Sequence, residues 1–362
     1  MYVKEEIITI ASDLIRFRST KKNEKARKEV IGYVRCFFEK ENVYIKEFEK
    51  NGVYSIVITL KKEKTPFLFL SGHLDVVSAK KEDFLPKVKG NRLYGRGSGD
   101  MKGGVAVMMM IMRDLSRMKK KSSVGFMLTT DEEVGGENGA GYLVNTKGYR
   151  SEFLIVPDGG TDLNEIILNQ KGILHLKVKA YGKLSHGARP FLGENAIEKL
   201  IGYYQKIQKI VPPLTKPEWK NSVNLGKIEG GKNANSVPDH AEMLLDIRLI
   251  KKGEKERIYK KIKKITEGNV EIIGEGKPFI QSEKHPLVKK YLKIASEEMK
   301  KDIKLTRVEG ASDARYFSAN GIPTIITKIN CENIHSDNEW FDLIQAKKFY
   351  TIVMRLVEKM KI

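Results

Sequence analysis

Residues 66–75 have the sequence PFLFLSGHLD, in which a nearly all-apolar run leads directly into a histidine and an aspartate. A short apolar run of this kind is typical of a strand that is buried on both faces of a parallel sheet. Similar runs occur at residues 124–130 and 153–156, and residues 103–115 have the pattern of a buried helix. Strands that alternate with helices predict an α/β domain with a mostly parallel sheet.

A second pattern begins at residue 173. Residues 173–180 alternate apolar and polar side chains, as in a strand with one face exposed to water. Helix patterns follow at 196–210 and 255–266, and strand patterns follow at 222–229, 241–250 and 270–273. The order strand-helix-strand-strand-helix-strand is that of a ferredoxin-like α+β unit. We therefore expect one domain formed by residues 1–172 and 286–362, with a second domain inserted at residues 173–285.

The composition indicates a soluble globular protein. The chain has 362 residues, of which 41% are hydrophobic and 31% are charged. No apolar run approaches the roughly 20 residues of a membrane helix, and the N-terminus lacks the apolar core of a secretion signal. Cys36 and Cys331 are the two cysteines and lie far apart in the sequence, so no disulfide framework is indicated. We expect a cytoplasmic protein without a membrane partner.

The chain is strongly basic, with a net charge of +20 from 66 Lys and Arg against 46 Asp and Glu. Such a charge can indicate nucleic-acid binding. The basic residues, however, are scattered in short lysine groups without interleaved aromatic residues. We therefore expect a lysine-rich solvated surface and no nucleic-acid partner. Attraction of an acidic substrate, or of an acidic carrier protein, stays open.

Polar residues follow the predicted inner strands. His73 follows the first strand, Glu132 and Glu133 follow the second, and Asp158 follows the third. Ligands in open α/β sheets gather outside the carboxyl ends of the strands. Histidines and carboxylates together suit zinc, with cobalt or manganese as substitutes. Two ions about 3.5–4 Å apart need one shared carboxylate and separate further ligands, and the chain contains enough ligands for this arrangement.

Two local patterns suggest other chemistry, but neither fits well. The glycine-rich loop at residues 93–104 lacks the GxGxxG fingerprint of a dinucleotide site and the Gly-Lys-Ser/Thr of a phosphate loop. The methionine run at residues 108–112 lies within an apolar helix pattern, which favours core packing over copper binding.

Six motifs occur together along the chain. They are GHLD, LYGRGSGDMKGG, TTDEEVGG, PDGG, GASDARYF and IHSDNEW, in this order. With this set the chain resembles the co-catalytic zinc hydrolase family of acetylornithine deacetylase, succinyl-diaminopimelate desuccinylase, aminoacylase and glutamate carboxypeptidase. The resemblance covers almost the full chain. It implies a zinc-binding α/β domain, an inserted dimerisation or lid domain, a homodimer and two zinc ions per chain.

The resemblance also implies a ligand set. His73 and Asp158 would bind one ion, and Glu133 and His335 would bind the other. Asp100 would bridge the two ions. The assignment of each residue comes from the motif in which it stands.

Two further residues receive catalytic roles by the same resemblance. Asp75, two residues after His73, would orient the imidazole. Glu132 would be the general base, which takes a proton from a metal-bridging water and passes it to the leaving amine. The water would attack the amide carbonyl of the substrate.

The remaining candidates would contact the substrate. His186, in the motif LSHG of the inserted domain, would reach across a dimer and stabilise the developing oxyanion. Asn235 and Arg248 resemble further substrate-contacting positions, and Arg315 would hold the α-carboxylate with its planar guanidinium. An ordinary structural ion pair is the alternative for both arginines.

We therefore expect a metal-dependent hydrolase that cleaves the amide bond of N-acyl amino acids, in the manner of biosynthetic deacetylases and desuccinylases. A metallo-carboxypeptidase or dipeptidase with the same mechanism is the alternative. Asp158 stands where the deacetylase and desuccinylase branches more often carry Glu, and the last motif lacks a common proline. A catalytically silent binding protein on this fold would lack a ligand or the base, and the chain lacks neither. The acyl group and side chain of the substrate stay open.

Overall fold

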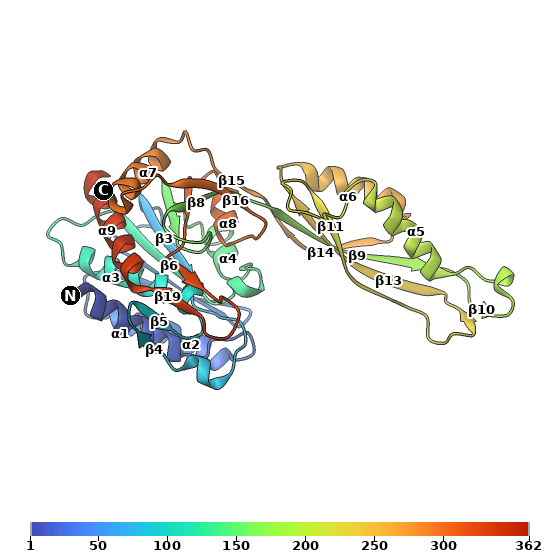
Figure 1. Ribbon diagram of the computed structural model, residues 1–362, viewed down its shortest axis with the longest axis horizontal. Coiled ribbons are helices and arrows are strands. Elements are labelled where there is room, and N and C mark those ends of the chain that lie inside the picture. The colour runs from blue at the N-terminus through green and yellow to red at the C-terminus, as the bar shows by residue number, and fades with distance from the viewer. Residues whose placement is uncertain (1, 361–362) are drawn as a thin grey trace. The chain divides into compact units, whose positions relative to one another are not determined.

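The computed structural model describes residues 2–360 and divides into two compact units, each treated separately below (Figure 1). The first unit comprises Met1–Asn169, Ile280–Val308 and Ser312–Ile362, and the second comprises Gln170–Phe279 and Glu309–Ala311. The main segment of the second unit thus runs from residue 170 to residue 279. The sequence patterns predict bounds of 173 and 285 for this domain.

The first unit is built on a large mixed sheet with the strand order β1-β2-β6-β3-β7-β17-β8-β15, and β16 lies beside β8. The strands are β1 (Tyr44–Lys50), β2 (Val53–Thr59), β3 (Leu68–His73), β6 (Val124–Thr129), β7 (Phe153–Val156), β8 (Glu165–Gln170), β15 (Phe279–Ile280), β16 (Lys304–Val308) and β17 (Thr324–Ile326). The central strands β6, β3, β7 and β17 are parallel, whereas the pairs β1–β2, β2–β6 and β17–β8 are antiparallel. The predicted mostly parallel central sheet is confirmed.

Helices cover this sheet. They are α1 (Tyr2–Arg16), α2 (Glu24–Phe38), α3 (Gly103–Ser116), α4 (Ala140–Asn145), α7 (Pro286–Met299), α8 (Ala314–Ser318) and α9 (Leu343–Met360). Helices α1, α3, α7 and α9 pack against one another (Figure 1). All methionines from Met108 to Met112 are buried in the core, so the prediction of core packing for this run is confirmed. Within residues 2–360, no helix is both long and apolar enough to cross a membrane.

A small second sheet connects distant parts of the first unit. Its strands are β4 (Lys87–Lys89), β5 (Arg92–Tyr94), β18 (Cys331–Glu332) and β19 (Trp340–Asp342), in the order β18-β19-β5-β4. Strand β5 enters the glycine-rich loop, and β18 and β19 enclose the segment with His335. The pairing of β19 with β5 therefore brings the Asp100 loop near His335.

The second unit has one four-stranded antiparallel sheet and two helices. The elements are β9 (Gly172–Tyr181), α5 (Ala196–Gln208), β11 (Ser222–Gly230), β13 (His240–Leu249), α6 (Glu254–Ile265) and β14 (Val270–Gly276). The strand order is β11-β13-β9-β14, as the predicted ferredoxin-like unit requires. The alternation in β9 is explained by its inner face, which packs into the same core as α5 and α6. A short pair, β10 (Ser185–His186) and β12 (Ser236–Val237), lies outside this sheet.

Candidate metal centre

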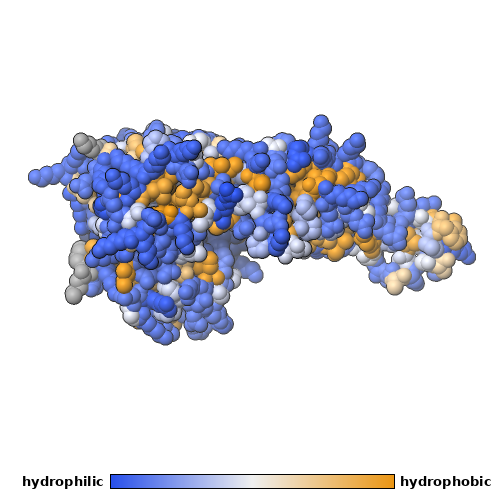
Figure 2. Space-filling model, turned by 45° about the horizontal axis from the view of Figure 1, so that its top comes forward, coloured by the Kyte–Doolittle hydropathy of each residue, from blue (hydrophilic) through white to orange (hydrophobic). Residues whose placement is uncertain are grey.

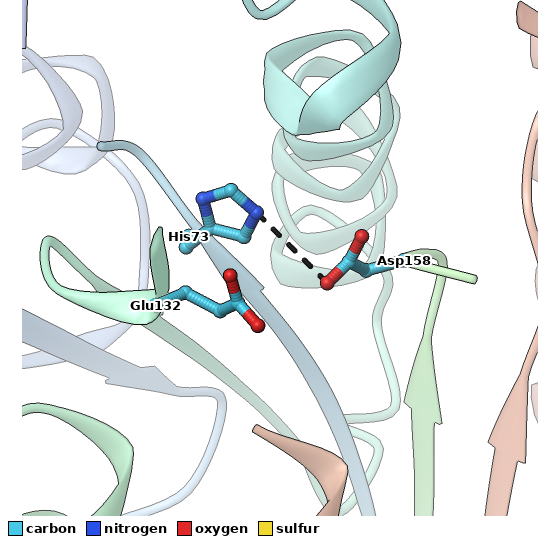
Figure 3. Close-up of side chains that lie close together, drawn as sticks. All are labelled: His73, Glu132 and Asp158. Carbon is cyan, nitrogen blue, oxygen red and sulfur yellow. Dashed lines mark ion pairs between the residues drawn. The ribbon is translucent and has the colours of Figure 1, made fainter. Parts of the chain in front are cut away.

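The central strands of the first unit bring three polar side chains together at one edge of the sheet. His73 is the last residue of β3, Glu132 begins a 3-10 turn shortly after β6, and Asp158 lies two residues beyond β7. Because these strands are parallel, their carboxyl ends lie at the same edge. Figure 3 shows the three side chains directed toward a common space.

Asp100 lies between the two histidines. Its Oδ1 atom is 3.3 Å from His73 Nε2, and its Oδ2 atom is 3.3 Å from His335 Nε2. Asp158 Oδ2 is 3.9 Å from His73 Nε2, and Glu133 Oε1 is 3.1 Å from His335 Nε2. The two oxygens of Asp100 thus face two different groups of candidate ligands.

These groups fit metal ions. His73, Glu132 and Asp158 form one group, and Asp100, Glu133 and His335 form the other, with the ligand atoms of each group within 4.8 Å of one another. Imidazole nitrogens and carboxylate oxygens are donors of the kind that zinc accepts. Glu132 lies within the first group, although the resemblance assigns it the role of base. A shared Asp100 and two separate histidines suit two divalent ions.

Burial and neighbouring charges shift the pKa values of the candidate ligands in different directions, and Lys328 with the two histidines holds the pKa of Asp100 well below its usual value. Burial and the negative charge of Asp158 raise the pKa of Glu132 well above its usual value, and burial together with Asp100 raises the pKa of Asp158 to about 6. Burial alone would lower the pKa of His73, but its interactions with Asp100 and Asp75 outweigh this effect and raise it. Asp100 and Glu133 raise the pKa of His335 to about 10. A metal ion that binds His73 or His335 near neutral pH must therefore displace a proton from the imidazole ring.

Asp75 organises the site in two ways. His73 Nδ1 lies 3.0 Å from the main-chain oxygen of Asp75 and 3.5 Å from its carboxylate. The carboxylate also accepts hydrogen bonds from the main-chain nitrogens of Glu132 and Glu133, at 3.2 and 3.0 Å. Asp75 thus holds both the imidazole and the turn that carries the two glutamates, whereas the sequence predicts contact with the imidazole alone.

Glu339 holds the glycine-rich loop, and the sequence analysis assigned it no role. Its carboxylate accepts hydrogen bonds from Arg96 Nη1 at 2.6 Å and from the main-chain nitrogens of Gly97, Gly99 and Asp100 at 2.9–3.0 Å. Its side chain is 1% exposed. Arg96 Nη2 also donates to Ser336 O at 3.1 Å. The contacts of Glu339 and Arg96 thus connect the loop with Asp100 to the segment with His335. In the sequence, the feature that could have indicated this role is the second acidic residue of the motif IHSDNEW.

Lys328 is a second residue that the sequence analysis missed. Its Nζ atom lies 3.8 Å from Asp158 Oδ1 and 3.9 Å from Asp100 Oδ2. The side chain is 5% exposed, so a positive charge is buried beside two candidate metal ligands. Nothing in the sequence distinguishes this lysine from the many others.

Arg315 lies beside the turn that follows Glu132. Its Nη2 atom donates to Gly135 O at 2.5 Å, and the Tyr316 hydroxyl donates to the same oxygen at 2.6 Å. Arg315 is buried, and its Nε atom has no hydrogen-bond partner among the described residues. The guanidinium therefore keeps a free donor near the candidate base.

The second unit holds the other three candidates. His186 and Asn235 are neighbours, since Gly187 N donates to Asn235 O at 2.7 Å, and both residues are exposed. Arg248, on β13, pairs with Asp246 through Nη2 at 2.9 Å and Nε at 3.2 Å. The structural ion pair that was the alternative to substrate binding for Arg248 is therefore present.

The segment from Leu184 to Leu192, which contains His186, exposes several large apolar side chains. Its exposed side chains include Leu184 at 62%, Phe191 at 80% and Leu192 at 52%. Figure 2 shows hydrophobic surface at the end of the second unit that carries β10, among other hydrophobic patches on both units.

Comparisons with known proteins agree with this geometry. The profile of Peptidase family M20/M25/M40 matches residues 69–359. An uncharacterised metallohydrolase of Methanocaldococcus jannaschii is 26% identical over 96% of this chain and 99% of its own length. A probable succinyl-diaminopimelate desuccinylase of Staphylococcus aureus is 26% identical over 87% of this chain and 88% of its own length.

A solved structure shares the fold. Aminopeptidase PepT of Bacillus cereus superposes with a TM-score of 0.81 and 20% identity, over 99% of both chains. The family resemblance carried by the six motifs is thereby confirmed. The match across most of the chain, together with the paired histidine and carboxylate groups, shows that this chain belongs to peptidase family M20/M25/M40 and is a metal-dependent hydrolase.

Proposed function

We propose that this chain hydrolyses the amide bond of small N-acyl amino acids with two zinc-class ions. The observation that carries the proposal is the position of Asp100, whose two oxygens each lie 3.3 Å from a different histidine. A shared carboxylate is what a pair of divalent ions requires. In this proposal His73 and Asp158 hold one ion, and Glu133 and His335 hold the other. Cobalt or manganese would be substitutes.

The reaction needs a base beside the ions. Bound divalent ions supply a Lewis acid for the amide carbonyl and lower the pKa of water. Glu132 takes the proton of the attacking water and delivers it to the leaving nitrogen. Its carboxyl group lies within 4.8 Å of the donor atoms of His73 and Asp158, which supports this role.

His186 is proposed to stabilise the oxyanion of the tetrahedral intermediate. Ala188 N donates to His186 Nδ1 at 3.1 Å, so the neutral ring carries its proton on Nε2. An Nε2–H group is a donor for an oxyanion. We assign His186 to the site of a partner chain in a homodimer, and the exposed apolar side chains around it support burial against another chain.

Arg315 is proposed to bind the carboxylate of the substrate. A guanidinium forms paired hydrogen bonds with a carboxylate, and the Arg315 Nε atom has no partner among the described residues. Asn235 and Arg248 are proposed as further substrate contacts. Arg248 would then share its guanidinium between Asp246 and the substrate. We also propose a cytoplasmic location, because the two cysteines, Cys36 and Cys331, lie far apart in the sequence and indicate no disulfide framework.

A metallo-carboxypeptidase or dipeptidase activity is the second candidate. Asp158 stands where the deacetylase and desuccinylase branches more often carry Glu, and this departure weakens assignment to those branches. The same ions, the same base and the same guanidinium would serve a peptide bond. The two candidates therefore differ only in the group on the acyl side of the amide.

A substrate screen separates them. Protein loaded with zinc or cobalt is tested on N-acetyl-ornithine, N-acetyl-lysine, N-succinyl-diaminopimelate and simple dipeptides, with Glu132→Gln protein from the same preparation as the control. Release of the acyl group by wild-type protein alone supports the first candidate. Cleavage confined to dipeptides supports the second. If the metal-loaded wild-type protein cleaves none of these amides faster than the control, both candidates are contradicted.

A further inference from the structure

Lys328 is a buried lysine at the carboxyl end of β17. The preceding residue, Thr327, donates its main-chain N–H to Val156 O at 3.2 Å and accepts from Gly159 N at 3.1 Å. These two bonds lie on either side of Asp158 in the sequence. They hold Lys328 next to Asp158 as part of the sheet, so its position is fixed by main-chain pairing.

The ammonium group lies close to two carboxylates but forms no direct hydrogen bond with either of them. Its distances of 3.8 Å to Asp158 Oδ1 and 3.9 Å to Asp100 Oδ2 exceed those of a direct hydrogen bond. The other oxygen of each carboxylate faces His73, at 3.3 Å from Asp100 and 3.9 Å from Asp158. The lysine and the metal ions therefore share the same two carboxylates.

Lys328 adds positive charge to a space that would also hold two divalent ions. Asp100, Glu133 and Asp158 would supply three negative charges as ligands, with Asp75 and Glu132 beside them, to two ions that carry four positive charges. Lys328 adds a fifth positive charge, and its side chain is only 5% exposed. Salt screens buried charges poorly, and like charges at short range repel strongly in a protein interior. The positive charge of Lys328 therefore repels each ion, and the first ion repels the second as well.

We propose that Lys328 is a resident cation of the metal centre, which weakens the binding of both divalent ions, so that the second ion, which the first ion also repels, is bound weakly. This inference rests on the proposed two-ion function. It gives the chain a one-ion state when free metal is scarce. In that state Lys328 partly neutralises the carboxylates that the absent ion would bind.

Zinc titrations test this assignment. Stepwise zinc affinities of metal-stripped protein are measured by competition with a fluorescent zinc chelator, for wild type, Lys328→Met and Lys328→Arg. We expect Lys328→Met to tighten the weaker affinity by about tenfold or more, because it removes a nearby positive charge. Lys328→Arg keeps the charge and should keep the weak binding of the second ion. Lys347→Met is the control, since Lys347 is exposed on α9 of the same unit.

Thermal unfolding distinguishes this role from a merely structural one. Loss of a structural residue lowers the melting temperature equally with and without zinc. Loss of a resident cation enlarges the rise in melting temperature on zinc addition, because ligand binding to the folded state adds stability. Lys328→Gln is the second uncharged variant if Lys328→Met does not fold. Zinc binding that is unchanged or weaker in the uncharged variants overturns this inference alone. Wild-type protein that binds no zinc overturns the proposed function as well.

Discussion

The two units hold their candidate residues in different ways. In the first unit, the His73 side chain is 2% exposed and the Glu339 side chain is 1% exposed, although His335 is 49% exposed, and hydrogen bonds link candidate metal ligands to the strands and loops around them. In the second unit, His186 is exposed on a small strand pair, and Asn235 is exposed in the turn directly before the second of these strands. Metal ligands need fixed geometry, which a buried sheet edge provides. Substrate-contacting groups need access, which an exposed loop provides.

The largest expected effect concerns the base in the first unit. Glu132→Gln should lower kcat by about 10²–10⁴-fold, the usual contribution of general-base catalysis, while metal content stays at the wild-type value. Glu133→Gln is the matched control and should lose metal. Steady-state kinetics and elemental analysis of both variants measure these effects. If Glu132→Gln lost metal and Glu133→Gln did not, the roles of the two adjacent glutamates would be reversed.

The next effect concerns the buried guanidinium. Conversion of the substrate carboxylate to a carboxamide should reduce transition-state stabilisation by about 2–5 kcal/mol, because Arg315 is then left without a charged partner. Arg315→Lys should not restore kcat/KM, since an ammonium lacks the two-pronged donor geometry. The measurement is kcat/KM for each substrate with wild type and variant. Equal values for the acid and its amide would falsify the assignment of Arg315.

A smaller effect tests whether the second unit serves a partner chain. His186→Ala and Glu132→Gln proteins should each be nearly inactive alone. After subunit exchange, an equal mixture should recover roughly a quarter of wild-type activity, because half of the dimers would be mixed and each would contain one intact site. Activity is measured before and after exchange, and mass spectrometry verifies that mixed dimers have formed. No recovery in a verified mixture would place His186 in the site of its own chain.

The smallest effect is linked to pH. Asp100 and Glu133 raise the pKa of His335 from 6.5 to about 10. In metal-free protein this shift contributes stability that is fully present below pH 6.5 and is lost as the pH rises toward 10. Zinc binds the deprotonated ring, so zinc affinity should rise with pH in the same window. Calorimetry in two buffers with different ionisation enthalpies measures the protons released at pH 7. Zinc binding without proton release would contradict this account.

Much of the first unit could be predicted because its inner strands are continuous apolar runs. His73 and Asp158 follow such runs, so their convergence at one sheet edge followed from the strand pattern. The ferredoxin-like order of the second unit was predicted in the same way, from alternating and helical periodicity. Short strands such as β18, with two residues, are too brief to show any period.

Other parts of the site depend on contacts between distant residues. Glu339 binds main-chain nitrogens about 240 positions upstream, and its four donors become apparent only when β19 pairs with β5. Lys328 is one of 66 basic residues, and only the pairing of β17 with β7 places it against Asp158. The roles of His186, Asn235, Arg248 and Arg315 came from resemblance alone and stay predictions.

The contact between Glu339 and the glycine-rich loop has a consequence for protein synthesis. Arg96 and Asp100 leave the ribosome long before His335 and Glu339, which lie 235 positions after Asp100 and 243 positions after Arg96, respectively. Until that segment emerges, the loop lacks the carboxylate that holds it, and the second histidine is missing. A nascent or prematurely terminated chain therefore lacks the complete metal centre. The hydrolase can become active only after the segment with His335 and Glu339 has been made.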